Sequence, residues 1–432
     1  MCESNSSNDS RLPMRPIDLQ SDVVASLNDV LKAFVSYGPL RPPSAPTGPL
    51  RGWPIAIKDN IDISGEVVSI GSPIYATRRA TTTATAVQRL FEAGASIVGR
   101  TQMVEMAFGG WGINESLGTP RNPWDRDVPR VAGGSSSGCA VAIAAGMVPT
   151  ALGGDTAGSI RMPAALCGIT GLKTSFGRIP VDGVFPLAPS YDTVGPMARS
   201  AEECARLFEV LAGTSLPDKA PDRRRVIRLD PLAYPVPVAP DVQRALDEAA
   251  DVFERLGVQW HKSAPPFELA QLTRDAGTLI AAEALEVHRS MFESRPEAFG
   301  KELRVRLEQA RNGDPAKVAA ARTARRESVQ RFNDWLATDD VLLLPTVHCT
   351  APAIDAIDEH TTPLGQFTRW VNHVGGCALS LPAGLDARGL PLAIQFVGRE
   401  GSEANILALG KAFQRATDWH LRQADLSWVH AP

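Results

Sequence analysis

Two glycine-rich loops that carry serine constrain this chain more than any other feature. The first loop, Gly133–Gly138, reads GGSSSG, and the second, Gly153–Arg161, reads GGDTAGSIR. Between them, Cys139–Leu152 is rich in alanine and predicts a tightly packed buried helix. Glycine lets the backbone approach a ligand and turn its N–H groups inward, as an anion or oxyanion site requires. The pattern therefore predicts that two loops, joined by one helix, form the base of an active site.

Composition and charge exclude several classes of protein. The 432 residues are 44% hydrophobic and 21% charged, with a net charge of −4, which is typical of a globular enzyme and gives no pull toward nucleic acid or an anionic membrane. The longest apolar stretch, Cys139–Val148, stops at Pro149, far short of the roughly 20 residues that span a bilayer. Residues Met1–Ser10 lack the apolar core of a secretory signal. We expect no nucleic-acid partner and no membrane contact.

The cysteines indicate a reducing compartment. They stand at positions 2, 139, 167, 204, 349 and 377, and no two form a CxxC pair. Such scattered cysteines in a large chain favour free thiols over a disulfide framework or a zinc site. The glycine runs also lack the GxxxxGK[ST] pattern of a phosphate-binding loop. We therefore expect a cytoplasmic protein without metal or cofactor.

Helical and strand patterns alternate along the chain, which predicts an α/β fold. The expected helices are Ile17–Phe34, Thr83–Ala93, Ala201–Gly213, Asp241–Leu256 and Ile406–Thr417. The expected strands are Pro54–Ile57, Ala95–Gly99, Val226–Leu229, Val341–Leu344, Gly375–Gly384 and Leu390–Gly398, with a further strand and turn in Gly168–Arg178. Proline-rich Tyr37–Arg51 predicts a loop, and Glu105–Asn122 predicts a loop that lines a pocket.

The domain organisation follows from the same survey. Helix formers dominate Leu269–Asn333, which indicates a helical insertion or cap over residues 265–335. No repeat, low-complexity tract or obvious linker interrupts the chain. We therefore expect a single domain over residues 1–432, with residues 1–16 disordered.

Three polar residues are the candidates for catalysis: Lys58, Ser135 and Ser159. A serine hydroxyl needs a base to remove its proton, and that base is usually histidine. All seven histidines lie at position 261 or later, and none stands in a recognisable motif. A lysine held neutral can replace histidine in serine–lysine sites. Taken singly, Lys58 could equally end a strand, Ser135 could cap a helix, and Ser159 could bond to a turn.

At these residues the chain resembles the amidase signature family. The matching segments are Pro54–Asn60, Gly118–Pro123, Gly133–Gly138, Gly154–Arg161, Cys167–Lys173, Asp192–Pro196, Leu381–Gly384 and Gly389–Pro391. They cover residues 50–210 densely and 340–420 more loosely. The resemblance implies a central mixed β-sheet flanked by α-helices on both faces. It also implies hydrolysis of a carboxamide or ureido C–N bond through an acyl-enzyme, with release of ammonia or an amine.

The resemblance assigns a role to each candidate. Ser159 is the nucleophile, Ser135 is a bridging serine preceded by a cis peptide bond, and Lys58 is the base. The backbone N–H groups of residues Thr156, Ala157, Gly158 and Ser159 are expected to bind the oxyanion. A working base needs a pKa of roughly 7–8 instead of about 10.4, and burial can lower it that far. Asp59 opposes this shift unless its side chain points away.

The substrate is less well defined by the sequence. Aromatic and apolar residues near the motifs are expected either to line an apolar pocket or to pack in the core: Met106, Phe108, Trp111, Phe185 and Tyr191. An apolar pocket favours aryl or indole carboxamides, as in the indoleacetamide hydrolase branch. Small ureido substrates, as in the carboxybiuret hydrolase branch, are the alternative. The expected partner is a small amide, and a homodimer is left open.

Two other functions compete with this hypothesis. Residues 134–138 also fit the GxSxG elbow of α/β-hydrolases, which would make Ser136 the nucleophile. The family also includes the A-type subunit of the glutamine-dependent aminoacyl-tRNA amidotransferase, although no basic RNA-binding signature is present. The chain departs from the family pattern at Ala157, Ser137 and Ala393, where glycine is usual. Asp155 and Arg161 are expected to form an internal ion pair that braces the second loop.

Overall fold

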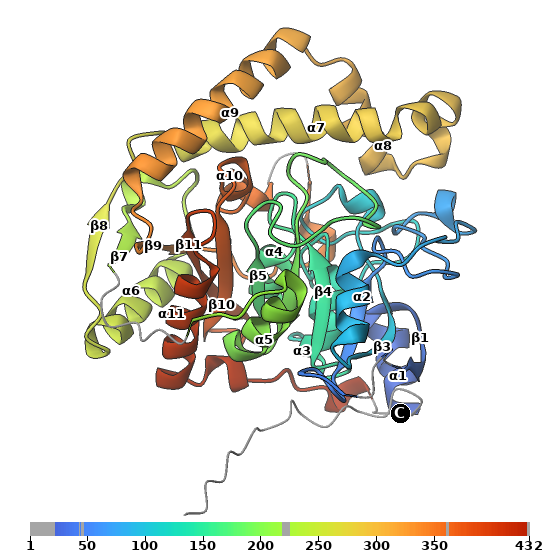
Figure 1. Cartoon of the computed structure of the whole chain (residues 1–432), viewed down its shortest axis with the longest axis horizontal. Coiled ribbons are helices and arrows are strands. Elements are labelled where there is room, and N and C mark those ends of the chain that lie inside the picture. Colours follow the sequence, from blue (N-terminus) through green and yellow to red (C-terminus); the bar gives the residue numbers. More distant parts are fainter. Residues whose placement is uncertain (1–21, 43, 45–46, 218–224, 360–362, 430–432) are drawn as a thin grey trace, which may run out of the picture.

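A single mixed sheet runs through the molecule (Figure 1). The computed structural model describes residues 22–42, 44, 47–217, 225–359 and 363–429. Within these residues eleven strands lie in the order β1-β3-β2-β4-β6-β5-β10-β11-β9-β7-β8. They are β1 (Phe34–Arg41), β2 (Pro54–Lys58), β3 (Ser96–Thr101), β4 (Thr150–Gly154), β5 (Thr170–Lys173), β6 (Val194–Ala198), β7 (Val226–Leu229), β8 (Trp260–Ser263), β9 (Val341–Pro345), β10 (Cys377–Leu385) and β11 (Pro391–Gly398).

Parallel strands occupy two separate parts of this sheet. Strands β3, β2 and β4 are mutually parallel, and so are β9, β7 and β8. The strands between these groups, from β4 through β6, β5, β10 and β11 to β9, pair antiparallel. The expectation of a mixed sheet is therefore confirmed.

Helices pack against both faces, as the alternation of side chains along each strand requires. In β2, Ile55 and Ile57 join one buried cluster and Ala56 joins another. The first cluster packs under α2 (Thr85–Glu92), α5 (Ala201–Ala212), α6 (Pro240–Arg255) and α11 (Glu403–Ala416). The second packs under α1 (Asp22–Leu31), α3 (Ser137–Ala144) and α4 (Arg161–Cys167). The predicted α/β architecture with helices on both faces is confirmed.

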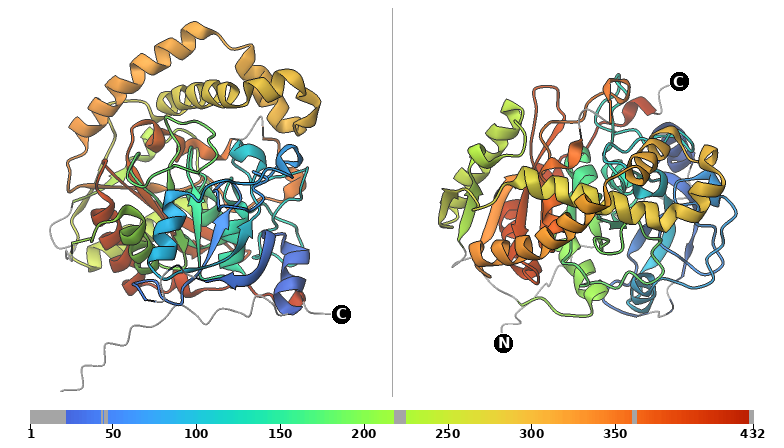
Figure 2. Two further views of the ribbon diagram at one scale, coloured as in Figure 1. Left: turned by 45° about the vertical axis from the view of Figure 1, so that its right-hand side comes forward. Right: turned by 90° about the horizontal axis from the view of Figure 1, so that it is seen from above.

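A layer of long helices lies across one end of the sheet (Figures 1 and 2). It consists of α7 (Leu269–Ser294), α8 (Lys301–Arg311) and α9 (Pro315–Trp335), which fill the segment where helix formers dominate the sequence. Helix α7 packs on α8, on α9 and on the short α10 (Arg369–His373). Its side chains Leu279, Ile280 and Leu285 join a buried cluster with loop residues of the sheet end. The layer therefore covers the edge at which β2 and β4 end.

The alanine-rich segment between the two serine loops is not the single helix that its composition predicts. Helix α3 ends at Ala144, and Gly146 adopts a φ of 71°, the left-handed conformation that stops a helix. Pro149 then prevents the helix from resuming, and β4 begins at Thr150. A central strand therefore delivers the second loop, parallel to β2 and beside it.

The N-terminal prediction also needs correction. The segment expected to be the loop Tyr37–Arg51 begins as strand β1, which pairs antiparallel with β3 at the edge of the sheet. An edge strand tolerates proline because one side of its backbone has no partner. Of the helix expected at Ile17–Phe34, the structure shows α1, while residues 1–21, including the tail expected to be disordered, lie outside the described residues. Among the described residues, no helix is both long enough and apolar enough to cross a membrane.

Candidate active site

The ends of two parallel neighbours bring the predicted catalytic groups together. Strand β2 ends at Lys58, and β4 ends at Gly154, directly before the second serine loop. The carboxyl ends of parallel strands share one edge of a sheet, where open α/β folds place their sites. The first serine loop enters from the side, and its Gly134–Ser135 peptide bond is cis, as expected. Lys58 Nζ donates a 2.8 Å hydrogen bond to Ser135 Oγ.

Burial gives Lys58 the properties of a base. Its side chain is 1% exposed, and burial lowers its pKa to about 8, although the charges of Cys139, Asp155 and Asp192 oppose the shift. An ammonium group has three N–H donors. Within the described part of the chain, Ser135 Oγ is its one hydrogen-bond partner. A neutral amine is better matched to this environment than an ammonium.

The neighbouring carboxylate does not restore the charge of Lys58. Asp59 turns away from the site and accepts a 2.6 Å hydrogen bond from Arg100 Nε. It also accepts hydrogen bonds from the backbone N–H and the hydroxyl of Ser69. The condition set by the sequence, that the Asp59 side chain must point elsewhere, is met.

Asp155 organises the second loop. Its carboxylate accepts hydrogen bonds from the backbone N–H groups of Gly158 (2.8 Å) and Ile160 (3.2 Å). Arg161 donates to it from Nε (3.0 Å) and Nη2 (3.1 Å), and Asn372 Nδ2 donates at 2.9 Å. Burial alone would raise the pKa of Asp155, but the charge of Arg161 and these hydrogen bonds lower it to about 2. The predicted ion pair between Asp155 and Arg161 is therefore present and completely buried.

The loop offers fewer oxyanion donors than expected. The Gly158 N–H is already bonded to Asp155, which leaves the N–H groups of Thr156, Ala157 and Ser159. None of these three has an acceptor among the described residues. Thr156 Oγ1 donates a 2.6 Å hydrogen bond to Asp192, which fixes this side of the loop. Burial raises the pKa of Asp192 to about 6.

The three serines of the first loop differ in what they contact. Ser136, the nucleophile of the elbow hypothesis, is fully buried, and its hydroxyl donates to Gly154 O (3.1 Å) and accepts from Gly154 N (3.3 Å). It thus ties the two loops together and is not among the residues that line the cavity. Among the described residues, the one hydrogen-bond partner of Ser137 Oγ is Ser135 O, at a long 3.5 Å. Among the described residues no hydrogen bond joins the hydroxyls of Ser135 and Ser159.

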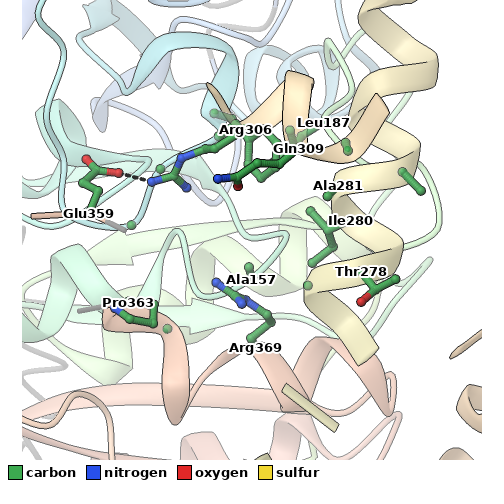
Figure 3. A pocket seen from close by; sticks show the side chains of 18 of the residues that line it. Ala157, Leu187, Thr278, Ile280, Ala281, Arg306, Gln309, Glu359, Pro363 and Arg369 are labelled. Carbon is green, nitrogen blue, oxygen red and sulfur yellow. Dashed lines mark hydrogen bonds and ion pairs between the residues drawn. The ribbon is translucent and has the colours of Figure 1, made fainter. Parts of the chain in front are cut away.

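Ser159 lines a cavity of about 640 Å³. Figure 3 shows part of the wall of this cavity. The wall is formed by residues 107–111, Ala157, Ser159, Met162 and Leu187, by five residues of α7 between 277 and 282, by residues from α8 to the start of α9, and by Glu359, residues 363–365 and Arg369. The helical layer α7–α9 therefore supplies its roof. In the close view, Arg306, Gln309, Glu359 and Arg369 place polar groups in this wall. No three histidine, cysteine, aspartate or glutamate side chains of the described chain are grouped to bind a metal ion.

Only part of the expected pocket lines this cavity. Phe108 and Trp111 are in the wall, as predicted. Met106 is buried in the cluster beneath α7, Phe185 packs against Tyr75 and His288, and the Tyr191 hydroxyl shares a 2.9 Å hydrogen bond with His373 Nδ1. Tyr191 lies in the buried cluster beneath α7, and Phe185 is half-buried against the same cluster, because the loop that carries them packs against α7. The sequence analysis missed Arg306, Glu359 and Arg369, since nothing in their surroundings marks them in a single sequence.

Comparison with known proteins finds relatives over most of the chain. The family model Amidase matches residues 19–407. The chain is 33% identical to the A-type subunit of the glutamyl-tRNA(Gln) amidotransferase of Thiobacillus denitrificans, over 94% of each chain. It is 33% identical to the putative amidase AmiD of Mycobacterium tuberculosis, over 87% of this chain and 82% of that protein. A solved vestigial protein complex, described as revealing the origins of an s-triazine catabolic enzyme, superposes with a TM-score of 0.81 at 28% identity, covering 91% of this chain and 93% of that one.

The Asp155 ion pair generates a stability prediction. Asp155→Asn leaves the buried charge of Arg161 without its counter-ion, and we expect a loss of about 3–5 kcal/mol in the free energy of unfolding, measured by urea denaturation at pH 7. The pKa of the Asp155 carboxyl falls from 3.8 to about 2 on folding. Its ionisation therefore adds to the free energy of unfolding in full above pH 4, and this stabilisation is lost as the pH falls through 2.

The exposed pair Arg422–Asp418, with side chains 53% and 56% exposed, provides the matched control. Asp418→Asn should change the free energy of unfolding by no more than about 1 kcal/mol. Equal effects of the two substitutions would show that Asp155 does not hold the loop.

Proposed function

This chain belongs to the amidase family, and from that membership we propose that it hydrolyses the C–N bond of a carboxamide or ureido substrate through an acyl-enzyme on Ser159. Lys58 is the base, and Ser135 relays the proton. The observation that carries the proposal is the buried 2.8 Å hydrogen bond from Lys58 Nζ to Ser135 Oγ, at the sheet edge from which the loop with Ser159 begins, while Ser159 itself lines the cavity.

The proposed reaction proceeds in two halves. Neutral Lys58 accepts the Ser135 proton while Ser135 accepts that of Ser159, whose hydroxyl turns toward it when substrate is bound. Ser159 Oγ attacks the carbonyl carbon, and the backbone N–H groups of Thr156, Ala157 and Ser159 stabilise the oxyanion, each donor contributing roughly 10²–10³ in rate. The C–N bond breaks as the proton returns along the relay to the leaving nitrogen. Water, deprotonated by the same relay, then hydrolyses the acyl-enzyme.

A second candidate function rests on the relatives. Several proteins that are 33–36% identical to this chain are A-type subunits of glutamyl-tRNA(Gln) amidotransferases. On this alternative, glutamine is the amide, and the released ammonia passes to an acceptor held by a second protein of the complex. The net charge of −4 gives this chain no electrostatic preference for RNA. Hydrolysis of amides by the isolated chain favours the first function, whereas glutamine cleavage that requires a second protein favours this one.

The test of the proposal combines ammonia release with trapping of the nucleophile. A panel of arylacetamides, ureido acids and glutamine is incubated with the purified chain, and a fluorophosphonate is used to label the active serine. We expect labelling on Ser159 by peptide mass spectrometry. Ser159→Ala should abolish labelling and lower turnover by at least about 10⁴-fold, because the nucleophile acts as a unit with its base.

Ser137→Ala is the matched control, because Ser137 lies in the same glycine-rich region and makes only one long contact. It should retain turnover and Ser159 labelling. Labelling of Ser136 would instead support the elbow hypothesis and contradict the assignment of Ser159 as the nucleophile.

The pKa of Lys58 generates a pH prediction. Only the neutral amine can act as a base, and its fraction rises as pH passes the pKa, which lies near 8. We therefore expect kcat/KM to rise tenfold per pH unit below 8 and to level off above it. Lys58→Met should lose this rise with pH, the acidic limb of the profile, and most of kcat/KM.

Lys173 supplies a demanding control for this experiment. It is also buried, and burial lowers its pKa to about 8, but its Nζ donates to the carbonyls of Thr174 (2.6 Å) and Gly376 (2.8 Å). Lys173→Met should keep the same limb as the wild type. Loss of the limb in Lys173→Met and its survival in Lys58→Met would show that Lys58 is not the base.

A further inference from the structure

One guanidinium group in the cavity stands without a partner in the part of the chain that the structure describes. Arg369 lies at the start of α10 and reaches into the cavity below Ala157 (Figure 3). Among the described residues, no carboxylate forms an ion pair with it and no acceptor hydrogen-bonds to it. The other arginine of the wall, Arg306, pairs with Glu359 and lies over the Phe108 ring, 5.6 Å from its centroid. Arg306 therefore has a carboxylate as counter-ion, whereas Arg369 has none among the described residues.

The other charged groups of the wall do not neutralise Arg369. They are Arg306, Asp314, Lys317 and Glu359. Glu359 is engaged by Arg306, and Asp314 is exposed and caps α9 by accepting a 2.8 Å hydrogen bond from Ala316 N. Burial and the nearby charge of Arg306 lower the pKa of Arg369 to about 10. Arg369 is half-buried in the cavity wall, and a partly desolvated charge without a counter-ion favours an anionic ligand.

Small residues make room for this guanidinium. A Cβ added at Gly277 of α7 would lie 3.0 Å from Arg369 Nη1, and one added at Gly365 would lie 3.7 Å from Nη2. The adjacent Thr368 donates a 2.8 Å hydrogen bond from Oγ1 to Ala157 O, and its carbonyl accepts from Arg161 Nη2 at 3.0 Å. Arg369 is thus held at a fixed place beside the loop that carries Ser159.

We propose that Arg369 binds a carboxylate on the substrate, so that the substrate class is an amide or ureido compound bearing one carboxylate remote from the bond that is cleaved. A single uncompensated guanidinium matches a monoanion, and its planar fork pairs with both oxygens of a carboxylate. This inference deepens the proposed function and rests on it for the reaction, but the binding of the anion can be measured without turnover.

The test measures binding in the Ser159→Ala background by calorimetry. The ligands are succinamate, glutaramate and adipamate, each compared with its methyl ester, which has the same amide and nearly the same size but no charge. We expect the best anion to bind at least about 30-fold more tightly than its ester. Adding Arg369→Met should remove that preference, and Arg369→Lys, which keeps the charge but loses the fork, should recover part of it.

Lys317→Met is the matched control, because it removes one positive charge from the same cavity at an exposed position. It should change the preference for the anion by less than about threefold. Arg369→Met without ligand should also melt at a higher temperature than its parent, because it removes a half-buried charge that has no counter-ion among the described residues. A purely structural role for Arg369 predicts the opposite shift.

The outcomes separate this inference from the proposed function. Equal binding of acid and ester, equal weakening of both by Arg369→Met, or no binding of any of the three anions overturns the inference. Binding of an anion that depends on Arg369, in a chain whose wild type releases ammonia from no amide, supports the inference and contradicts the proposed hydrolysis. If the chain hydrolyses neutral amides and Arg369→Met leaves that rate unchanged, the proposed hydrolysis is supported and the carboxylate inference is contradicted.

Discussion

The buried carboxylate of Asp155 is the interaction on which the site depends. It stands directly after β4 and binds the N–H groups of its own loop, Arg161 and Asn372. Arg161 in turn reaches Thr368 O and the side chains of Asn372 and Gln395. Segments more than 200 residues apart in sequence therefore meet at one ion pair. Because both charges are excluded from water, neither can be removed without leaving the other unpaired.

This arrangement explains how a loop of small residues can present a serine in a fixed place. Asp155 accepts a hydrogen bond from the Gly158 N–H and so fixes the turn, while Asp192 accepts one from the Thr156 hydroxyl. The N–H groups of Thr156, Ala157 and Ser159 have no acceptor among the described residues and are the donors that we propose for the oxyanion. The same network positions Thr368, and with it the start of α10, so the proposed carboxylate site and the proposed nucleophile Ser159 share one support. The central sheet holds Lys58 at the same edge, where burial keeps its pKa low enough for a base.

The sequence predicted side chains that the structure brings together, Lys58 with Ser135 and Asp155 with Arg161, because glycine loops, a lysine at a strand end and the family pattern are local signals. It also predicted the mixed sheet and the helices over residues 269–333. It failed at β4 because a short apolar run of alanines and glycines fits a buried strand as well as a buried helix. For the cavity it found only Phe108 and Trp111, because the rest of the wall combines α7, α8 and the segment before α10. The pairing of Arg306 and the isolation of Arg369 among the described residues depend on these distant contacts, which periodicity cannot reveal.

The central claim is that Lys58 loses its proton near pH 8, well below the ordinary lysine value, so that the neutral amine is available as a base. The direct measurement is an NMR titration of the side-chain nitrogen in protein labelled with ¹⁵Nζ-lysine, with the signal assigned by its absence in the spectrum of Lys58→Met. The signal of Lys173, which titrates in the same range, is assigned in the same way from Lys173→Met. The account predicts a midpoint for Lys58 near pH 8. A midpoint at or above the ordinary lysine value of about 10.4 would contradict it, because the base would then be protonated throughout the working range.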